Sequence, residues 1–275
     1  MTVVGIEKVS FCDVIFDTPS GPNIFRYESP QRWEEMPLTR SSDISYATYP
    51  PVKRIATISD RPHDFPEYDM LIEEPDKPPI LFTGAHSRLL YEITQGHISL
   101  WANAKRQLIN LDRHDDFMLG STEYRSDDIH IGNWVAGGAV GGYWGSYIHL
   151  DEEYEPVLPI MQSLEVIPVG LAMQTMPVSK VFTRYNFTQL QSVIKGLLDK
   201  TGDDPFIFSL DADSVADWGR TFTDDSSQML KVILHEVLSR RNIELFHFTP
   251  SPAYCPAEEA VKVWDKFRDV WQRTK

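Results

Sequence analysis

QLINLDRHDDF, residues 107 to 117, joins an apolar run of strand length to a cluster of charged residues. A short apolar run bounded by polar residues is typical of a strand buried inside a sheet. Beyond it, Asp112, His114 and Asp116 occupy alternate positions. Because alternate residues of an extended segment project to one side, these side chains can converge on a common point. The segment therefore predicts a buried strand that ends in a polar site.

Apolar runs of strand length alternate with helical periodicity on both sides of this segment. Upstream, ILFTG at residues 80–84 precedes a helix that is expected to begin at about Ser87. Downstream, strands are expected at FIFSLD (206–211) and IELFHF (243–248), and amphipathic helices at NFTQLQSVIKGLLDK (186–200), SSQMLKVILHEVLSRR (226–241) and PAEEAVKVWDKFRDVWQR (256–273). Such alternation is typical of βαβ units. We therefore predict an α/β fold with three layers, in which helices cover both faces of a mainly parallel central sheet (αβα).

The first eighty residues differ in composition from the rest. They are rich in proline and acidic residues, and PSGP, RPHDFP and EEPDKPP separate short β-like pieces such as KRIATI at 53–58. Because proline interrupts regular elements, this section is expected to consist of irregular strands and loops. A length of 275 residues suits one large domain. We predict a single domain over 1–275, with 1–80 as its N-terminal extension.

The glycine-rich piece WVAGGAVGGYWG, residues 134–145, is a further candidate for a role near the site. It lacks the GxGxxG and GxxxxGK[ST] spacings of nucleotide-binding loops. Its glycines predict a short loop.

The charge balance excludes one class of partner. The formal net charge is −14 and the isoelectric point is near 5.0. Nucleic acid is not expected as a partner, because binding to phosphates needs clustered lysine and arginine. Cationic ligands suit an acidic protein better.

Cysteine content and the first residues predict a cytoplasmic protein without a membrane partner. Cys12 and Cys255 are too few for a secreted disulfide framework. MTVVGIEKVSFCDVIFD carries charges where a signal peptide needs an apolar core, and no stretch has 18 uncharged apolar residues.

A second expected strand ends in similar chemistry, because FIFSLD ends at Asp211 and Asp213 follows two residues later. Ligands collect at the carboxyl ends of strands in an open parallel sheet. Several carboxylates brought together repel one another unless a cation compensates them. Carboxylates with imidazoles suit Mn²⁺ above all, then Zn²⁺ or Fe²⁺, and shared carboxylates can bridge two ions that activate water for hydrolysis.

Each cluster also has a purely structural explanation. D-x-H-x-D is compatible with an exposed turn, and D-x-D is compatible with a helix start, where aspartate caps backbone donors. Their joint occurrence at two strand ends of one βα pattern favours a metal site.

The chain resembles the ureohydrolase superfamily, which includes arginases and agmatinases. LINLDRHDDF and FIFSLDADSVADW are similar to that family's D-A-H-x-D and S-x-D-x-D-x-x-D motifs, and TGAHSRLL at 83–90 is similar to its G-G-D-H-S segment. The resemblance spans residues 83–217 and implies an arginase-like fold with two Mn²⁺ ions. The implied ligands are His86, Asp112, Asp116 and Asp211 for one ion, and His114, Asp112, Asp211 and Asp213 for the other.

The resemblance also implies catalytic roles. His130, in DDIHIGNWV, falls near the family histidine that passes a proton to the leaving amine, and Asp116 would help the metals stabilise the tetrahedral intermediate. His247, in IELFHFTPSPAY, occupies the place of the family glutamate that pairs with guanidinium. This departure argues against the specificity of small-molecule arginases.

Three segments, HSRLLYEI, LDRHDDF and GNWVAGGAV, are more similar still to a divergent branch of the superfamily. Peptide arginases in that branch convert arginine to ornithine within ribosomally made precursor peptides. The resemblance implies an arginine-containing precursor peptide as partner, with urea as second product. Asn133, Trp134 and His247 would contact this substrate. The sequence leaves open whether the chain forms a homo-oligomer.

Three rival functions remain at this point. A small-molecule ureohydrolase of the agmatinase kind would use the same two ions. A deacetylase-like amidohydrolase would need only one Asp, His, Asp set around one zinc ion. A non-catalytic binding protein could keep the metal site for structure or recognition.

Overall fold

The computed structural model describes residues 15–18, 21–24, 36–37, 52–58, 69–84, 86–101, 106–114, 116, 132, 134–151, 172–177, 187–199, 202–216, 221–250 and 254–274. Within these ranges, three short strands pair antiparallel in the order β1 (Ile15–Thr18), β2 (Gly21–Ile24) and β3 (Met36–Pro37). No helix among the described residues has the length and apolar character needed to cross a membrane.

A second, larger sheet forms the centre of the molecule. In the described part of the chain it has eight strands in the order β4-β5-β6-β11-β10-β7-β8-β9. Their bounds are β4 Lys53–Ile55, β5 Met70–Ile72, β6 Ile80–Phe82, β7 Gln107–Leu111, β8 Ser146–Asp151, β9 Ala172–Pro177, β10 Phe206–Asp211 and β11 Ile243–Thr249. The six strands from β6 to β9 along this order run parallel. β4 and β5 run the opposite way, because β5 pairs antiparallel with β6 and parallel with β4.

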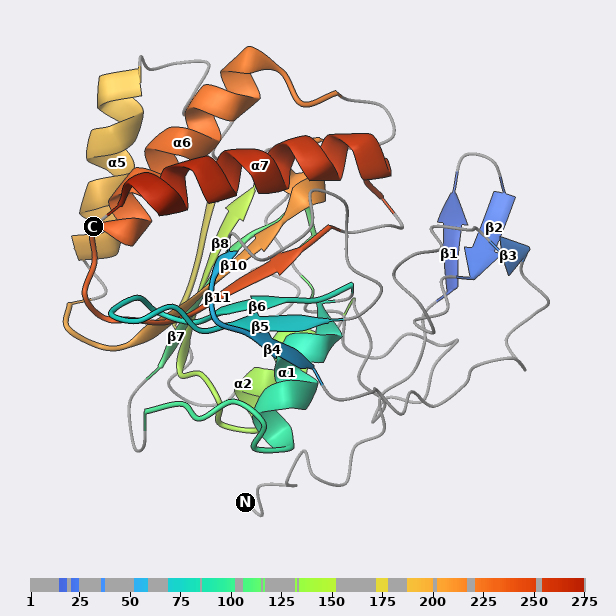
Figure 1. The fold of residues 1–275 in the computed structure, drawn as a ribbon, viewed down its shortest axis with the longest axis horizontal. Helices are drawn as coiled ribbons and strands as arrows, with labels where there is room; N and C mark the ends of the chain where they lie inside the picture. The colour runs from blue at the N-terminus through green and yellow to red at the C-terminus, as the bar shows by residue number, and fades with distance from the viewer. Residues whose placement is uncertain are drawn as a thin grey trace.

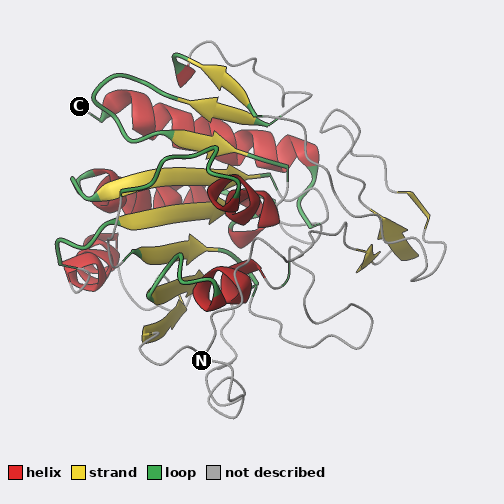
Figure 2. Cartoon of the chain, turned by 90° about the horizontal axis from the view of Figure 1, so that it is seen from below, coloured by secondary structure: helices red, strands yellow, loops and turns green. Residues whose placement is uncertain are grey.

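Helices cover both faces of this sheet. Their bounds are α1 Ser87–Thr94, α2 Trp134–Val140, α5 Phe187–Asp199, α6 Asp224–Leu238 and α7 Ala257–Arg273, with a short 3-10 turn at Ala212–Ser214. Figure 1 shows α5, α6 and α7 on one face and α1 and α2 on the other, and Figure 2 shows the same layers from below. The predicted three-layer α/β fold with a mainly parallel sheet is confirmed.

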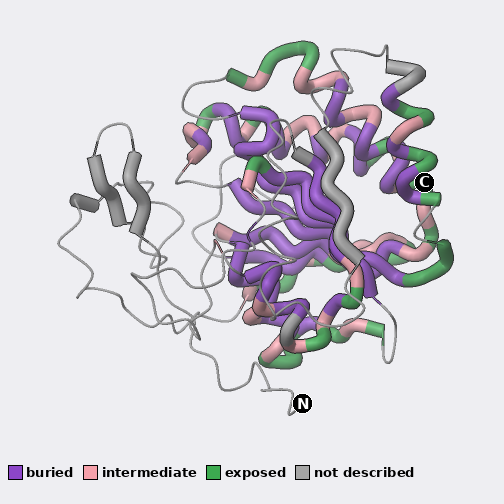
Figure 3. The backbone as a smooth tube through the Cα atoms, turned by 180° about the vertical axis from the view of Figure 1, so that it is seen from behind, coloured by how far each residue is buried: buried purple, intermediate pink, exposed green. Residues whose placement is uncertain are grey.

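Side chains of the central strands alternate between two hydrophobic clusters. In β10, Phe206, Phe208 and Leu210 pack with α5, α6 and α7, whereas Ile207 packs with α1 and α2. Strands enclosed on both faces are apolar almost throughout, which explains why β7, β10 and β11 appear in the sequence as continuous apolar runs. Figure 3 shows these strands as the buried centre of the molecule.

Helix α7 packs against strands β6 and β11, which lead to the site. Trp264, Phe267 and Trp271 recur at helical spacing and are buried. The Trp264 ring lies edge-on to Phe82 of β6 at 5.2 Å and 4.9 Å from Phe248 of β11. Such aromatic contacts contribute about 0.5–1.5 kcal/mol each beyond burial. They hold β6 and β11 side by side.

The glycine-rich piece was wrongly predicted as a loop, because residues 134–140 form helix α2. The reason is packing. A Cβ on Gly138 would lie 1.8 Å from Cζ2 of Trp144, so this position must be glycine for the indole to pack against the helix. The indole Nε1 of Trp144 also donates to the carbonyl of Val135 at 3.0 Å. Glycine serves here for close approach of a side chain.

Candidate metal centre

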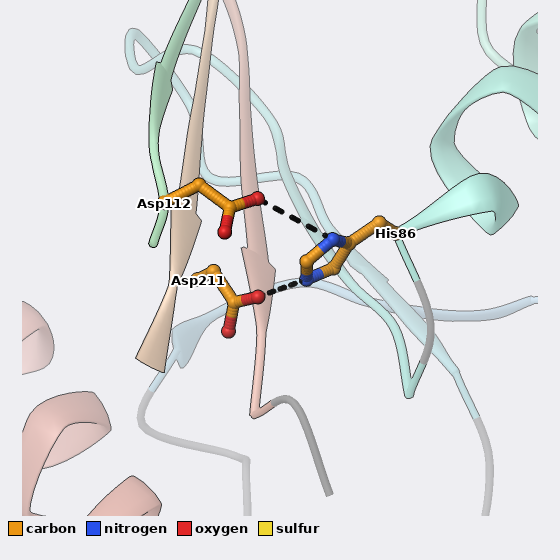
Figure 4. A group of neighbouring side chains, drawn as sticks. All are labelled: His86, Asp112 and Asp211. Atoms are coloured by element: carbon orange, nitrogen blue, oxygen red, sulfur yellow. Dashed lines mark ion pairs between the residues drawn. The ribbon is translucent and has the colours of Figure 1, made fainter. Parts of the chain in front are cut away.

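The candidate site lies at the carboxyl ends of two neighbouring strands. β7 and β10 pair in parallel, with Leu111 opposite Leu210. Asp112 and Asp211 are the next residues, so their carboxylates lie side by side, as Figure 4 shows. His86, directly before α1, faces both of them in the same view. Three segments that are distant in the sequence thus meet at one edge of the sheet.

His86, Asp112 and Asp211 form one group of buried side chains that can hold an ion. The Nδ1 atom of His86 lies 3.5 Å from Oδ2 of Asp112. On the other side of the ring, Nε2 faces Oδ2 of Asp211. Asp116 joins this group, since its Oδ2 lies 2.8 Å from Nδ1 of His86. The structure therefore brings together the four residues expected around the first ion.

Asp112, His114 and Asp213 form a second group. The Nδ1 atom of His114 lies 3.1 Å from Oδ2 of Asp213 and 3.8 Å from Oδ1 of Asp112. Asp112 belongs to both groups, so the two candidate ion positions are adjacent. The His114 side chain is 40% exposed, whereas those of Asp112 and Asp213 are buried. The second group therefore lies on the more open side of the cluster.

The two aspartate motifs share one local conformation. Oδ1 of Asp112 accepts a hydrogen bond from the backbone N–H of His114 at 2.8 Å. Oδ1 of Asp211 accepts one from the N–H of Asp213 at 3.1 Å. Aspartate favours such turns because its short side chain reaches the backbone two residues on. Each strand end thereby turns its next candidate ligand, His114 or Asp213, toward the same point.

Asp116 is held in an unusual backbone conformation. Its φ of 51° lies in the left-handed region, which costs energy for a residue other than glycine. The indole Nε1 of Trp134 donates to Oδ2 of Asp116 at 2.5 Å, and the N–H of Val135 donates to its carbonyl at 3.2 Å. The start of α2 thus fixes Asp116 beside His86.

The cluster concentrates negative charge away from water. Burial raises the pKa of Asp112 well above its usual value, and the neighbouring carboxylates raise it further. Burial lowers the pKa of His86, but the surrounding carboxylates more than offset this and place it well above its usual value. The pKa of His114 rises to about 9, because its contact with Asp213 outweighs the effect of burial. These shifts indicate a site that requires positive charge.

The donor atoms fit divalent ions. Nε2 of His86 and Oδ2 of Asp211 are buried and face each other, and neither has a hydrogen-bond partner among the described residues. Buried polar atoms normally have hydrogen-bond partners, so a pair without them suits a shared cation. Carboxylate oxygen and imidazole nitrogen are donors that suit Mn²⁺, Zn²⁺ or Fe²⁺.

A row of buried polar residues lies directly beneath the cluster. Asn110, Ser209, His247 and His149 occupy matching register positions on neighbouring strands. Nδ2 of Asn110 donates to Oδ2 of Asp112 at 3.0 Å, and Nε2 of His149 donates to the Asp112 carbonyl at 2.9 Å. Asn110 and His149 were not predicted as site residues. A polar residue two positions before Asp112, inside an apolar run, is the signal that points to Asn110.

His247 lies in this row. It is 1% exposed, its Nε2 lies 2.8 Å from Oγ1 of Thr83, and its Nδ1 lies 3.0 Å from Oγ of Ser209. Burial, and then the charge of His86, place its pKa well below the usual value, so the ring is neutral. Its predicted contact with a substrate stays a prediction.

Tyr254 is a site residue that sequence reasoning missed. Its ring is partly exposed and lies 4.4 Å from the His114 ring. Burial and then the charges of the four nearby aspartates raise its pKa, so the phenol stays protonated. It follows the proline-containing stretch TPSPA, which carries no recognisable motif, so only the structure identifies it. Tyr254 and His114 together mark the open side of the cluster.

Two predicted site residues, His130 and Asn133, lie outside the described residues. Their roles stay predictions. Trp134 is described and is buried beside Asp116.

Comparison with known proteins supports the fold. No family model matches the chain, and no curated protein sequence matches it. Among solved structures, an arginase from Entamoeba histolytica in complex with L-ornithine is similar at a TM-score of 0.50 and 14% identity, over 70% of this chain and 68% of that one. Proclavaminate amidino hydrolase from Streptomyces clavuligerus is also similar, at a TM-score of 0.46 and 16% identity, over 71% of this chain and 64% of that one. The chain spans less than two thirds of the amidino hydrolase.

Proposed function

We propose that this chain hydrolyses guanidino groups with two Mn²⁺ ions, and that its substrate is arginine within a precursor peptide. The products are peptidyl ornithine and urea. The observation that carries the proposal is that Asp112 belongs to two adjacent His and Asp groups at neighbouring strand ends. A fold shared with an arginase gives further support.

The residues proposed to hold the ions are His86, Asp112, Asp116, Asp211, His114 and Asp213. When bound, the ions neutralise these carboxylates and lower the pKa of water toward neutrality, so that water is a nucleophile at physiological pH. Two ions suit this donor set better than one, because a single zinc ion would leave carboxylates of the other group uncompensated.

The reaction consumes one water molecule. Water adds to the guanidino carbon, the bond from that carbon to the arginine side-chain nitrogen breaks, and urea departs. The released nitrogen must gain a proton to leave as an amine, and His130 is the proposed donor. Asp116, held by the Trp134 indole, would stabilise the positive charge of the guanidino group during addition.

A peptide substrate suits the open side of the cluster. Among the described site residues, His114 and Tyr254 are partly exposed. A guanidinium group can stack on an aromatic ring and pair with carboxylates behind it. The net charge of −14 would attract a basic peptide at low ionic strength.

The direct test supplies manganese and three substrates: free arginine, agmatine, and a synthetic arginine peptide with blocked ends. We expect urea from the peptide, with a mass loss of about 42 Da per arginine, as hydrolysis of the guanidino group to an amine requires. Asp211→Asn, which removes one ligand charge, should abolish urea release.

The outcomes separate the rivals. Urea from agmatine or arginine but not from the peptide would identify a small-molecule ureohydrolase. Acetate from an acetyl-lysine peptide, with one zinc ion bound, would identify a deacetylase-like enzyme. Two bound ions without any product would leave a binding protein and contradict the proposal.

A further inference from the structure

Asp69, Arg88 and Glu92 form a buried charged triad beside the candidate metal centre. Arg88 and Glu92 are fully buried and Asp69 is 3% exposed. Nε of Arg88 lies 2.5 Å from Oε1 of Glu92 and 3.3 Å from Oδ2 of Asp69. Buried arginine is rare, and a buried ionic network seldom adds net stability, because desolvation offsets the attraction. The triad is therefore better explained by a role in positioning the chain segments around it than by a contribution to stability.

Asp69 contacts the chain on both sides of His86, through the backbone of Gly84 and through the side chain of Arg88. Oδ1 of Asp69 accepts a hydrogen bond from the N–H of Gly84 at 3.0 Å. Arg88 follows His86 by two residues, in the first turn of α1. One carboxylate thus contacts the segment before the ligand through Gly84, and the segment after it through Arg88.

The sheet topology explains how Asp69 reaches this place. The other strands of the site bring their carboxyl ends to this edge. β5 runs antiparallel to β6, with Met70 opposite Phe82. Asp69, which precedes β5, therefore lies beside the carboxyl end of β6, next to the segment that leads to His86. Because β5 runs opposite to the parallel strands, its amino end, and therefore Asp69, lies at the same edge as their carboxyl ends.

We propose that Asp69 is a positioning residue that acts through Gly84 and Arg88 to hold His86 in place for metal binding. This inference rests on the proposed metal centre. It assigns a function to the region before residue 80, which supplies the reversed strands β4 and β5 at the edge of the central sheet.

The test compares Asp69→Ala and Asp69→Asn with the wild-type chain by calorimetric titration with Mn²⁺. We expect Asp69→Ala to lower the affinity for one of the two Mn²⁺ ions by about 10-fold to 100-fold, the range typical of residues that orient metal ligands. Asp69→Asn keeps one acceptor oxygen and should recover part of this loss. Hydrogen exchange in metal-free protein should show faster exchange of the Gly84 amide in Asp69→Ala.

A matched control exists at the opposite end of the strands. Arg106 and Glu244 form another buried ion pair, with Nη2 of Arg106 3.0 Å from Oε1 of Glu244. Arg106 precedes β7 and Glu244 lies at the start of β11, so both are at the amino ends. Glu244→Ala should lower thermal stability without changing manganese affinity or exchange at Gly84.

Two failures can be told apart. If the wild-type chain binds no manganese, the metal centre is wrong, while the exchange experiment still decides whether Asp69 holds the segment before His86. If the wild type binds two ions and Asp69→Ala binds them as tightly as Glu244→Ala does, the positioning role is overturned. Equal exchange at Gly84 in all variants would overturn it independently of metal.

Discussion

At the scale of single residues, Asp112 is the side chain on which both halves of the cluster depend. It approaches His86 through one oxygen and His114 through the other. Asn110 and the backbone of His114 fix its carboxylate, and His149 fixes its carbonyl. A group held by so many partners loses little entropy when it binds an ion.

This sharing predicts unequal effects of two similar substitutions. Asp112→Asn removes a charge from both groups, so we expect it to abolish binding of both ions. Asp213→Asn removes a charge from the second group alone and should leave about one ion bound. Metal analysis after gel filtration counts the ions. Equal loss in the two variants would show that Asp112 is not shared.

Tyr254 gives a second prediction at this scale. Tyr254→Leu removes the ring beside His114, and we expect KM for the arginine peptide to rise about 2-fold to 10-fold, as loss of one aromatic contact of about 0.5–1.5 kcal/mol implies. Manganese affinity should not change. Tyr143→Leu serves as control, because the Tyr143 ring packs against the hydrophobic cluster beneath α1 and α2. An unchanged KM in Tyr254→Leu would exclude contact with substrate.

At the scale of elements, the agreement between sequence and structure follows the strength of the local signal. The strands β7, β10 and β11 and the helices α5, α6 and α7 lie where the apolar runs and the helical periodicity place them. Each of these elements carries its own hydrophobic pattern, which is a local property. Helix α2 carries no such local pattern, because its glycine at position 138 is explained only by the Trp144 ring that packs on it.

Two helix glycines therefore predict opposite effects of the same substitution. Gly138→Ala places a Cβ against Trp144 and should destabilise the protein by about 1–3 kcal/mol. Gly196→Ala, on the exposed face of α5, meets no atom within 4 Å and should stabilise it by about 0.5–1 kcal/mol. Urea unfolding measures both. Similar values for the two variants would contradict the packing explanation.

At the scale of the whole molecule, the acidic cluster makes stability depend on pH and metal together. The pKa of His114 is raised from 6.5 to about 9 in the folded chain. A raised pKa means that the folded state binds more protons than the unfolded state, so this contribution is complete below pH 6.5 and is lost as pH rises through about 9. The raised pKa of Asp112 acts in the same direction.

We therefore expect the Tm of the metal-free protein to fall as pH rises from about 6.5 to about 9. Manganese should reverse this trend, because it competes with protons for the same groups and binds more tightly as they leave. Differential scanning calorimetry with a chelator and with excess Mn²⁺ compares the two. A metal-free Tm that rises over this range would contradict the site electrostatics.

The sequence by itself determined the positions of strands β6, β7, β10 and β11 and of helices α1, α5, α6 and α7, and the residue types at the two strand ends. Both follow from neighbours along the chain. An apolar run predicts a buried strand, and an aspartate side chain bonds the backbone two residues on and so forms a turn. The candidate ligands were named on this basis and on the resemblance to ureohydrolases: His86, Asp112, His114, Asp116, Asp211 and Asp213. The structure brings all six together.

Only the tertiary structure decided which strands are neighbours and how the site is supported. β7 pairs with β10 across about one hundred residues of sequence, and this pairing makes Asp112 a member of both groups. The contacts of Asp69 with Gly84, of Asn110 with Asp112 and of Tyr254 with His114 arise in the same way. Such contacts depend on how whole layers pack, and the packing energy of a layer is not encoded in any short stretch of chain.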